Sequence, residues 1–452
     1  MTGGRHPGRI RIGCGAGFSG DRIEPAVELA VHGELDYLVF ECLAERTIAL
    51  AQRARHANPA AGSDPLLSAR MRAVLGTCAE QGVRIITNMG AANPRAAAAQ
   101  VADIARGLGL RGLKIAAITG DDVLEAVMAG NPPLIGLAGR VEDLGRDRIV
   151  SANAYLGAAP ITRALANGAQ IVIAGRMADP ALFLGPLVHE FGWAWDDWTR
   201  LGRGTLVGHL LECAGQVTGG YFADPGFKDV ADLARLGFPF ADVTLDGGCH
   251  VSKVTGSGGL VDVRTCTEQL LYEIGDPAAY LTPDVTADFS GVGFVADGPD
   301  RVLVTGGGGR PAPQDLKVSV GYLDGYVGEG QISYAGPNAV ARGRLALAIV
   351  AERLKLTGAA VDDLRSELIG VDAFYAAAAE AHGQVPEVRA RVAGRGKTMS
   401  AAEQIGAEVE SLYTNGPAGG GGATRSAAPV MAIASVLIPR TAVSPRIHWV
   451  TA

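Results

Sequence analysis

The chain has 452 residues, a formal net charge of −7 and a hydrophobic content of 48%, which excludes a disulfide-stapled miniprotein and a largely disordered chain. It has no run of five basic residues, so we expect binding to neither nucleic acid nor an anionic membrane. The longest apolar stretch, residues 427–439, is too short to span a bilayer and is predicted to belong to the core. With no apolar signal segment and no CxxC pair, we expect a cytoplasmic protein with reduced thiols and a small-molecule substrate.

Up to about residue 180, short apolar runs alternate with helical patterns, which is typical of βα units and predicts a parallel sheet. Asn93-Pro94 and Asp179-Pro180 are expected helix starts, because a side-chain acceptor caps the first amides and proline at the first helical position needs no donor. Asn167-Gly168 is expected to end the helix before the last strand. The predicted strands are residues 9–14, 37–41, 83–88, 113–118 and 170–174.

The pattern changes after an amphipathic stretch at residues 198–216. Strands and turns are expected from about residue 241 to 334, and helices at residues 339–356 and around 376–392. We therefore predict an α/β fold in which an N-terminal parallel-sheet (βα repeat) domain, residues 1–224, precedes a smaller mixed α+β domain, residues 225–452.

The first predicted strand leads into a glycine loop in which Gly15, Gly17 and Gly20 have the GxGxxG spacing, and the next strand ends at Glu41. This spacing imitates a dinucleotide-binding fingerprint. In that motif, however, the helix begins within the glycines, and Pro25 would then lie in its second turn, where proline clashes with the preceding turn.

A helix that begins near Glu24 fits this segment better. Three interpretations of the glycine loop stay open: an NAD site, a tight turn without a ligand, and a loop whose free amides bind substrate or phosphate beside Ser19 and Asp21.

Polar side chains follow the ends of the predicted strands, where open α/β sheets bind their ligands. Converging carboxylates, amides and a guanidinium could clamp an acid and move a proton. Capping is the alternative role for Asn93, Asp121 and Asp179, whereas Arg176 directly follows a buried strand and is a candidate clamp for a carboxylate or an oxyanion. The polar side chains at the strand ends are Ser19 and Asp21, Glu41 with Glu45, Asn88 with Asn93, Asp121, and Arg176 with Asp179.

In the segment GHLLECAGQ, four polar residues share one helical face, which suggests a cavity. Glu212 or His209 could act as a general base, and the alternative is a satisfied core histidine. One helix supplies too few ligands for a metal, and the only matching second cluster is Cys249-His250, so no metal is predicted. The four residues are His209, Glu212, Cys213 and Gln216.

Two further segments carry candidate binding residues. KVTGSGG at residues 253–259, with Lys253 and Gly258, could cradle a phosphate such as that of coenzyme A, although it does not match a Walker loop. Residues 329–336, beginning at Glu329, are expected to form either an active-site loop or an ordinary connector.

Long blocks over nearly the whole chain resemble the acyclic terpene utilisation (AtuA) family. They are RIGCGAGFSGDR at residues 11–22, LDYLVFECLAERT at 35–47, VSANAYLGAAPI at 150–161, IVIAGRMADPALFLGPLVHEFGW at 171–193, GTLVGHLLECAGQVTGGYF at 204–222, EGQISYAGP at 329–337 and NGPAGGGG at 415–422. The resemblance implies a role beside bacterial citronellol and geraniol degradation, which passes through branched acyl-CoA thioesters. It supplies neither an established reaction nor a settled list of catalytic residues. The family segment KHPGTGG reads KVTGSGG here, so substrate choice is expected to differ.

We therefore predict an enzyme that acts on a small branched acyl compound, a carboxylate or an acyl-CoA thioester, by proton transfer of the hydratase or lyase type. The alternatives are an NAD-dependent oxidoreductase and a non-catalytic ligand-binding or scaffold subunit. The candidate catalytic residues are Glu212, His209, Arg176, Glu41 and Asp179, and the candidate binding residues are Gly17, Ser19, Gly20, Asp21, Asn88, Asn153, Lys253, Gly258 and Glu329.

The resemblance also bears on partners. Longer relatives carry an additional small ferredoxin-like domain, elsewhere a separate polypeptide, so we expect a surface near residues 427–439 that associates with another chain. We predict a homo-oligomer, or a complex with such a subunit, the former being favoured because symmetric self-association is commoner. Light scattering on the purified chain should give a mass above that of one copy. A stable monomer that captures no small protein from its native lysate would contradict both expectations.

Overall fold

The computed structural model describes residues 8–375 and 385–452 of the chain. The chain forms two compact units, the first made of Met1–Gly321 with Ile433–Ala452 and the second of Tyr322–Ala432. Both crossings between the units lie within long strands, β14 (Asp315–Ala335) and β17 (Gly421–Pro439). The predicted domain boundary at residues 224 and 225 lies inside the first unit.

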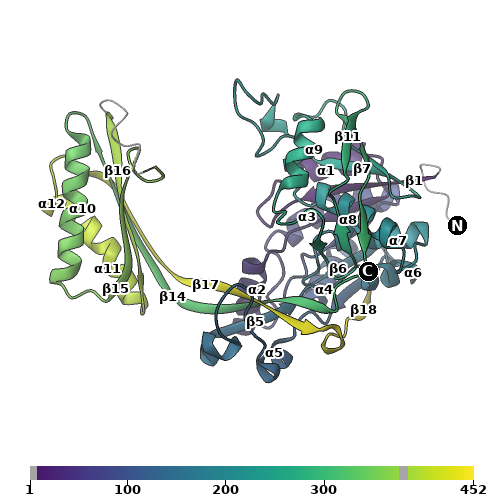
Figure 1. Cartoon of the computed structure of the whole chain (residues 1–452), viewed down its shortest axis with the longest axis horizontal. Coiled ribbons are helices and arrows are strands. Elements are labelled where there is room, and N and C mark those ends of the chain that lie inside the picture. Colours follow the sequence, from purple (N-terminus) through teal and green to yellow (C-terminus); the bar gives the residue numbers. More distant parts are fainter. Residues whose placement is uncertain (1–7, 376–384) are drawn as a thin grey trace. The chain divides into compact units, whose positions relative to one another are not determined.

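A ten-stranded sheet forms the centre of the first unit (Figure 1). Five neighbouring strands, in the spatial order β1-β2-β3-β6-β4, are parallel to one another, and antiparallel strands extend the sheet at both edges. The five strands predicted for the N-terminal half are therefore confirmed. Across the whole sheet the strands are β11 (Gly293–Ala296), β12 (Arg301–Thr305), β8 (Cys249–Lys253), β7 (Pro239–Thr244), β1 (Arg9–Ala16), β2 (Tyr37–Phe40), β3 (Arg84–Thr87), β6 (Ile171–Ala174), β4 (Lys114–Thr119) and β18 (Arg446–Thr451).

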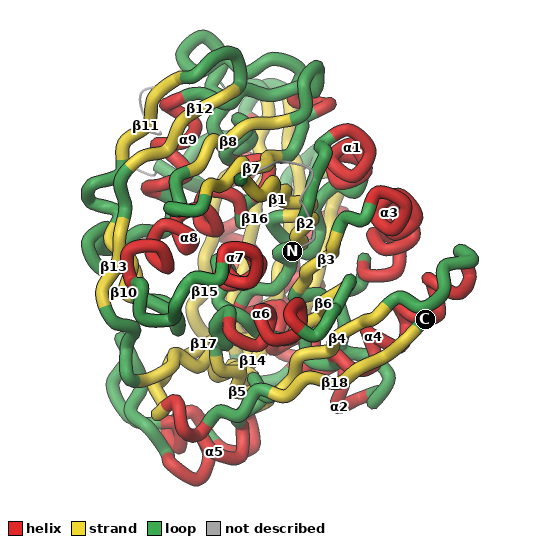
Figure 2. Tube along the Cα trace, turned by 90° about the vertical axis from the view of Figure 1, so that its right-hand side faces the viewer, coloured by secondary structure: helices red, strands yellow, loops and turns green. Residues whose placement is uncertain are grey.

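Helices cover both faces of the parallel strands. This explains why β2 and β6 are apolar at every position instead of alternating. Figure 2 shows α1, α3 and α4 on one face and α6, α7 and α8 on the other. The helices of this unit are α1 (Glu24–His32), α2 (Glu45–Ala57), α3 (Leu67–Gln81), α4 (Pro94–Gly107), α5 (Leu124–Gly130), α6 (Ala159–Ala166), α7 (Ala181–Phe191), α8 (Trp198–Leu211) and α9 (Val263–Leu271).

The predicted helix ends are mostly confirmed. α1 begins at Glu24, the side chain of Asn93 caps α4, and Gly168 follows α6 with a φ of +84°. α7 is the exception, because it begins at Ala181 without a side-chain cap. The expectation that Asp179 caps this helix is wrong, since its carboxylate is paired with a guanidinium instead.

Strands that we assigned to a second domain join the first sheet. β7 pairs antiparallel with β1 from Arg9 opposite Thr244 to Gly13 opposite Phe240. Arg11 reinforces this pairing, because its Nε lies 2.8 Å from the buried carboxylate of Asp242. One sheet therefore continues across the predicted boundary. The remaining strands of this unit are β5 (Ile149–Ala154), which pairs with β14, and the three-stranded sheet of β13 (Gly308–Arg310), β10 (Thr286–Asp288) and β9 (Tyr280–Leu281).

Apart from one four-residue helix, the described elements of the second unit follow the order βαββαβ. Its strand order, β15-β16-β14-β17, and the antiparallel pairing of β16 with both neighbours match the ferredoxin-like arrangement. Two long helices pack on one face of this sheet (Figure 1). Its elements, besides β14 and β17, are α10 (Ala339–Leu356), β15 (Val361–Ile369), β16 (Glu387–Gly396), α11 (Met399–Glu410) and α12 (Leu412–Asn415).

Three predictions for this part of the chain need correction. Residues 387–392 belong to β16 and not to a helix, because Val388, Ala390 and Val392 alternate with charged side chains on the other face. Residues 376–384 of that predicted helix lie outside the described residues. Glu329 lies within β14, not in a loop. Residues 427–439 belong to β17 and are buried only in part, at Met431, Ala434, Val436 and Ile438. None of the described helices is long and apolar enough to cross a membrane.

Two glycines in helices offer a matched test of packing in the first unit. A Cβ on Gly202 of α8 would lie 1.9 Å from the carbonyl oxygen of Gly308, whereas one on Gly76 of α3 would meet no atom within 4 Å. We expect Gly202→Ala to destabilise the unit by roughly 1–3 kcal/mol or more, and Gly76→Ala to stabilise it by about 1 kcal/mol. Urea denaturation midpoints measure both changes. Equal effects of the two substitutions would contradict the close approach of α8 and β13.

Candidate functional site

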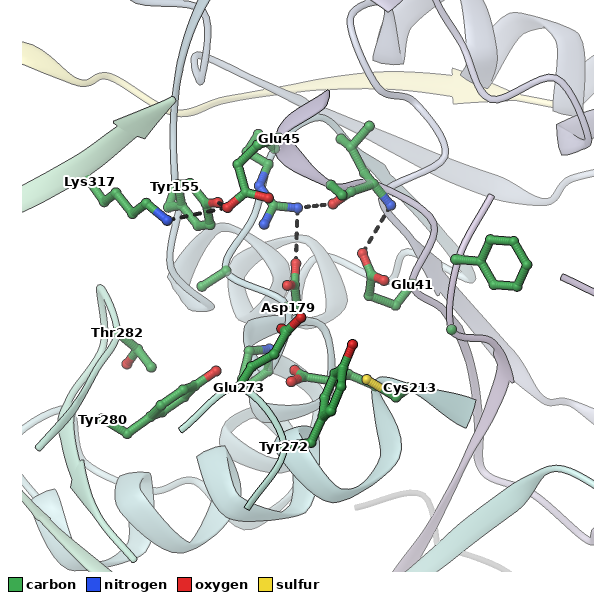
Figure 3. A pocket seen from close by; sticks show the side chains of 18 of the residues that line it. Glu41, Glu45, Tyr155, Asp179, Cys213, Tyr272, Glu273, Tyr280, Thr282 and Lys317 are labelled. Atoms are coloured by element: carbon green, nitrogen blue, oxygen red, sulfur yellow. Dashed lines mark hydrogen bonds and ion pairs between the residues drawn. The ribbon is translucent and has the colours of Figure 1, made fainter. Parts of the chain in front are cut away.

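A cavity of about 1160 Å³ opens in the first unit at the carboxyl ends of the parallel strands (Figure 3). Its walls come from the segments that follow β1, β2 and β6, from the end of α8, and from residues near positions 280 and 315. Six predicted site residues line it: Glu41, Arg176, Asp179 and Glu212 of the catalytic set, and Gly17 and Asp21 of the binding set.

Arg176 connects several of these walls. Its side chain is buried, with only 1% exposed. Its Nη1 donates a hydrogen bond to the carbonyl oxygen of Leu43 and lies 3.0 Å from the carboxylate of Asp179. Its guanidinium also lies 4.2 Å from the ring centroid of Tyr155. Burial opposes its charge, but the neighbouring carboxyl groups of Asp179, Glu41 and Glu45 outweigh this effect and raise its pKa. Arg176 therefore stays cationic, and its Nη1 is engaged by the protein itself.

Glu41 directly follows β2 and lies beside this cation. Its Oε1 accepts hydrogen bonds from the Leu43 amide at 2.9 Å and from Asn88 Nδ2 at 2.8 Å. Burial and the neighbouring charge of Asp179 raise the pKa of Glu41 in spite of Arg176. Asn88 is fully buried behind Glu41 and also accepts a hydrogen bond from the amide of Cys42. Asn88 is thus placed to orient Glu41, and it does not itself line the cavity.

Glu45, Tyr155 and Lys317 form a polar group on another wall (Figure 3). The hydroxyl of Tyr155 donates to Glu45, and Lys317 Nζ lies 3.2 Å from the same carboxylate oxygen. Burial opposes ionisation of Glu45, but the hydrogen bond from Tyr155 and the charges of Arg176 and Lys317 outweigh it and lower the pKa of Glu45 to about 2. Glu45 is therefore an ionised partner for two cations.

His209 and Glu212 form a pair at the end of α8. His209 Nε2 faces the carbonyl oxygen of Leu270 at 3.1 Å, and its Nδ1 lies 3.0 Å from Glu212 Oε1. Burial lowers the pKa of His209, but the hydrogen bond and charge of Glu212 and the Leu270 carbonyl reverse this and raise it overall. His209 is 2% exposed and is not a lining residue, so it supports Glu212 from behind and is not placed to act as the base itself.

Glu212 presents its second oxygen differently. Oε2 is buried and accepts no hydrogen bond from any residue that the structure describes, although Glu212 lines the cavity. A buried carboxylate oxygen normally has partners, and one that lacks them in a cavity is a candidate for binding a ligand or a proton.

The glycine loop lies beside this pair, and its glycines have packing roles. A Cβ on Gly17 would lie 2.6 Å from the backbone of Cys213, one on Gly15 would lie 2.7 Å from the ring of Phe40, and one on Gly20 would lie 2.7 Å from the ring of Phe18. The amide of Gly17 donates to the carboxylate of Asp21 at 2.9 Å. Moreover, β1 has only one parallel neighbour, β2, because β7 on its other side is antiparallel. The glycines are therefore accounted for by packing, while Gly17 and Asp21 also line the cavity, so that contact of this loop with a substrate stays open.

Arg70, which the sequence did not single out, holds this loop in place. It is fully buried, and its Nη2 donates to the carbonyl oxygens of Phe18, Ser19 and Asp21. The hydroxyl of Ser19 donates a hydrogen bond to the carboxylate of Asp64 at 2.5 Å. Ser19 itself does not line the cavity.

The structure does not bring the other predicted binding residues to the cavity. The side-chain amide of Asn153 donates a hydrogen bond to the carboxylate of Asp121, which also accepts one from the backbone amide of Arg176. Asp121 therefore does not cap a helix. Burial raises the pKa of Asp121 to about 6. Lys253 lies 3.0 Å from Asp300. The residues of the binding set that do not line the cavity are Ser19, Gly20, Asn88, Asn153, Lys253, Gly258 and Glu329.

Two of these positions have a local explanation. A Cβ on Gly258 would lie 2.1 Å from the carbonyl oxygen of Asp232, so a close backbone approach requires glycine there. Glu329 belongs to the second unit, where it lies 2.6 Å from Arg391. Within residues 8–375 and 385–452, no group of three or more His, Cys, Asp and Glu side chains is placed to hold a metal ion.

Several lining residues carried no recognisable sequence signal. Most of them come from irregular segments or a very short strand, in which periodicity gives no information, and Lys317 lies near the start of the long strand β14. They are Tyr155, Tyr272, Glu273, Tyr280 and Lys317.

The depressed pKa of Glu45 leads to a prediction of pH dependence. Its folded-state value of about 2 lies below the ordinary value of 4.5, so its ionised form stabilises the fold above pH 5 and this contribution is lost as the pH falls toward 2. Glu45→Gln should therefore be less stable than the wild type at pH 7, and the difference between their urea midpoints should shrink at pH 4 and again at pH 3. A difference that is constant over this range would contradict the ion pair.

The comparisons with known proteins give one positive result. No curated protein and no solved structure matches the chain. The sequence model of the family described as acyclic terpene utilisation family protein AtuA matches residues 10–449. Because this match covers nearly all of the sequence, the chain belongs to the acyclic terpene utilisation (AtuA) family.

Proposed function

We propose that this chain is an enzyme that transfers a proton next to the carbonyl group of a small branched acyl compound, in a reaction of the hydratase or lyase type. The observation that carries the proposal is Glu212, whose Oε1 is held by His209 and whose buried Oε2 has no partner among the described residues of a cavity wall. A carboxylate oriented in this way is suited to accept a proton from carbon.

The other carboxyl groups supply the complementary role. Burial raises the pKa values of Glu41 and Asp179, and for Glu41 the charge of Asp179 adds to the effect. A carboxyl group with a raised pKa retains a proton that it can give to a departing group, whereas Glu212 accepts one. Separate proton donors and acceptors around one cavity are what a hydratase or lyase requires.

With a 3-hydroxyacyl substrate, the proposed reaction removes water. Glu212 Oε2 takes the proton from the carbon next to the carbonyl, and the electron pair of that C–H bond forms the carbon–carbon double bond. The bond to the hydroxyl group breaks, and the hydroxyl leaves as water with the proton of Asp179 or Glu41. Hydration follows the same course in reverse.

The remaining walls fit an apolar and branched substrate. Aliphatic and aromatic side chains contribute much of the lining, and the volume exceeds what a short acyl chain needs, which leaves room for a carrier such as a thioester arm. The family name agrees with a branched hydrocarbon skeleton. Among the apolar residues are Phe18, Leu43, Phe238, Leu281, Leu316 and Leu437.

Replacement of Glu212 tests the proposal. Glu212→Gln keeps the shape and removes the charge, so exchange of deuterium from D2O into branched acyl-CoA thioesters, followed by NMR, should fall by roughly 100-fold or more while the melting temperature changes little. Glu190→Gln is a matched control, because Glu190 accepts a hydrogen bond from Tyr37 outside the cavity. If Glu212→Gln melts early yet keeps its rate per folded molecule, Glu212 is a structural ion-pair residue. Binding of the thioesters without exchange in the wild type would favour the non-catalytic alternative.

A further inference from the structure

Tyr280 is a lining residue held in a fixed orientation. It lies in β9, where it pairs with Ala287 of β10. Its ring is 5.3 Å from the ring of His209 and 5.3 Å from that of Phe289, and these two rings also stack on each other at 5.7 Å. Three packed rings leave the phenol little freedom to turn. The same His209 orients Glu212, so one histidine positions both side chains.

The hydroxyl group of Tyr280 makes no hydrogen bond with any residue that the structure describes, and Figure 3 shows this side chain reaching into the cavity toward Glu273. Burial, and then the charges of Glu212 and Asp179, raise the pKa of Tyr280. The phenol is therefore protonated at neutral pH, and it can donate a hydrogen bond to an acceptor in the cavity.

The charges of the cavity wall restrict what that acceptor can be. Two of the three basic residues of the lining have carboxylate partners, Arg176 in Asp179 and Lys317 in Glu45, whereas the exposed Arg22 donates from Nη1 to the carbonyl oxygens of Leu233 and Ala234. Even with Glu41 and Asp179 protonated, the acidic residues of the lining outnumber the basic ones, namely Asp21, Glu45, Glu212, Glu273 and Asp315 against Arg22, Arg176 and Lys317. A substrate carboxylate would meet repulsion from this acidic majority.

Taken together with the proposed function, on which this inference rests, these contacts lead to one assignment. We propose that Tyr280 is a catalytic residue that donates a hydrogen bond to an uncharged carbonyl oxygen of the substrate, and that the site accepts thioesters and excludes the corresponding free acids. When Glu212 removes the proton, negative charge develops on that oxygen, and a donor fixed beforehand stabilises it.

The experiment measures the hydrogen bond itself as well as the rate. The probes are [1-¹³C]isovaleryl-CoA, the N-acetylcysteamine thioester of isovaleric acid, and free isovalerate. In the wild type, isotope-edited infrared spectra should show the bound thioester carbonyl stretch at a lower frequency than in solution. In Tyr280→Phe, which keeps the ring stack, the frequency should return toward the solution value, and deuterium exchange should fall by roughly 100- to 1000-fold.

Two control variants separate the roles. Glu212→Gln should keep the lowered carbonyl frequency and lose exchange, because the donor remains and the base is gone. Tyr37→Phe removes a buried hydroxyl that bonds Glu190 and Arg84 outside the cavity, so it should keep both the frequency and the exchange rate. Thermal shift should show stabilisation by the thioesters and none by isovalerate.

Each result decides a separate point. Thioester binding with the same carbonyl frequency in wild type and Tyr280→Phe overturns the role of Tyr280 and leaves the proposed function standing. A stronger thermal shift with isovalerate than with the thioesters overturns the selection against free acids. A lowered frequency that depends on Tyr280, without exchange in the wild type, overturns the proton-transfer function alone. If neither thioester binds, both proposals fail.

Discussion

The cavity depends on one buried cation, the guanidinium of Arg176. Removal of such a charge from water costs several kcal/mol unless opposite charges and hydrogen-bond acceptors surround it. Here the acceptors come from the chain after β2 and the charges from Asp179, Glu41 and Glu45, with the Tyr155 ring beside them. The need to compensate one charge therefore fixes the ends of β2 and β6 and the segment after β5 in relation to one another.

The same cation sets up the division of chemical roles. The carboxyl groups nearest to it differ in their pKa shifts, because Glu45 has partners enough to overcome burial and Glu41 does not. Glu212 lies beyond them and is oriented instead by His209. One cluster thus holds ionised and protonated carboxyl groups side by side, which a uniformly solvated set of acids could not do.

Much of this arrangement could be predicted from the sequence, where local patterns carried the information. Continuous apolar runs identified the parallel strands, Pro25 placed the start of α1, and the positions after strands identified Glu41, Arg176 and Asp179. The domain boundary could not be predicted, because the pairing of β7 with β1 joins residues more than two hundred positions apart. Tyr280 was missed because a two-residue strand has no periodicity, and Arg389 and Arg391 were assigned to a helix because an alanine-rich stretch precedes them.

The two long strands have a consequence for how such a chain can be built. β14 carries the chain into the second unit, β17 carries it back, and the two are neighbours in one sheet. The second unit is therefore an inserted domain whose entry and exit points belong to adjacent strands. An insertion of this kind adds little loop-closure entropy to its host, because the ends to be joined are already paired. Gain, loss or exchange of the βαββαβ unit during evolution would thus require only a hairpin between these strands, without rearrangement of the sheet that forms the cavity.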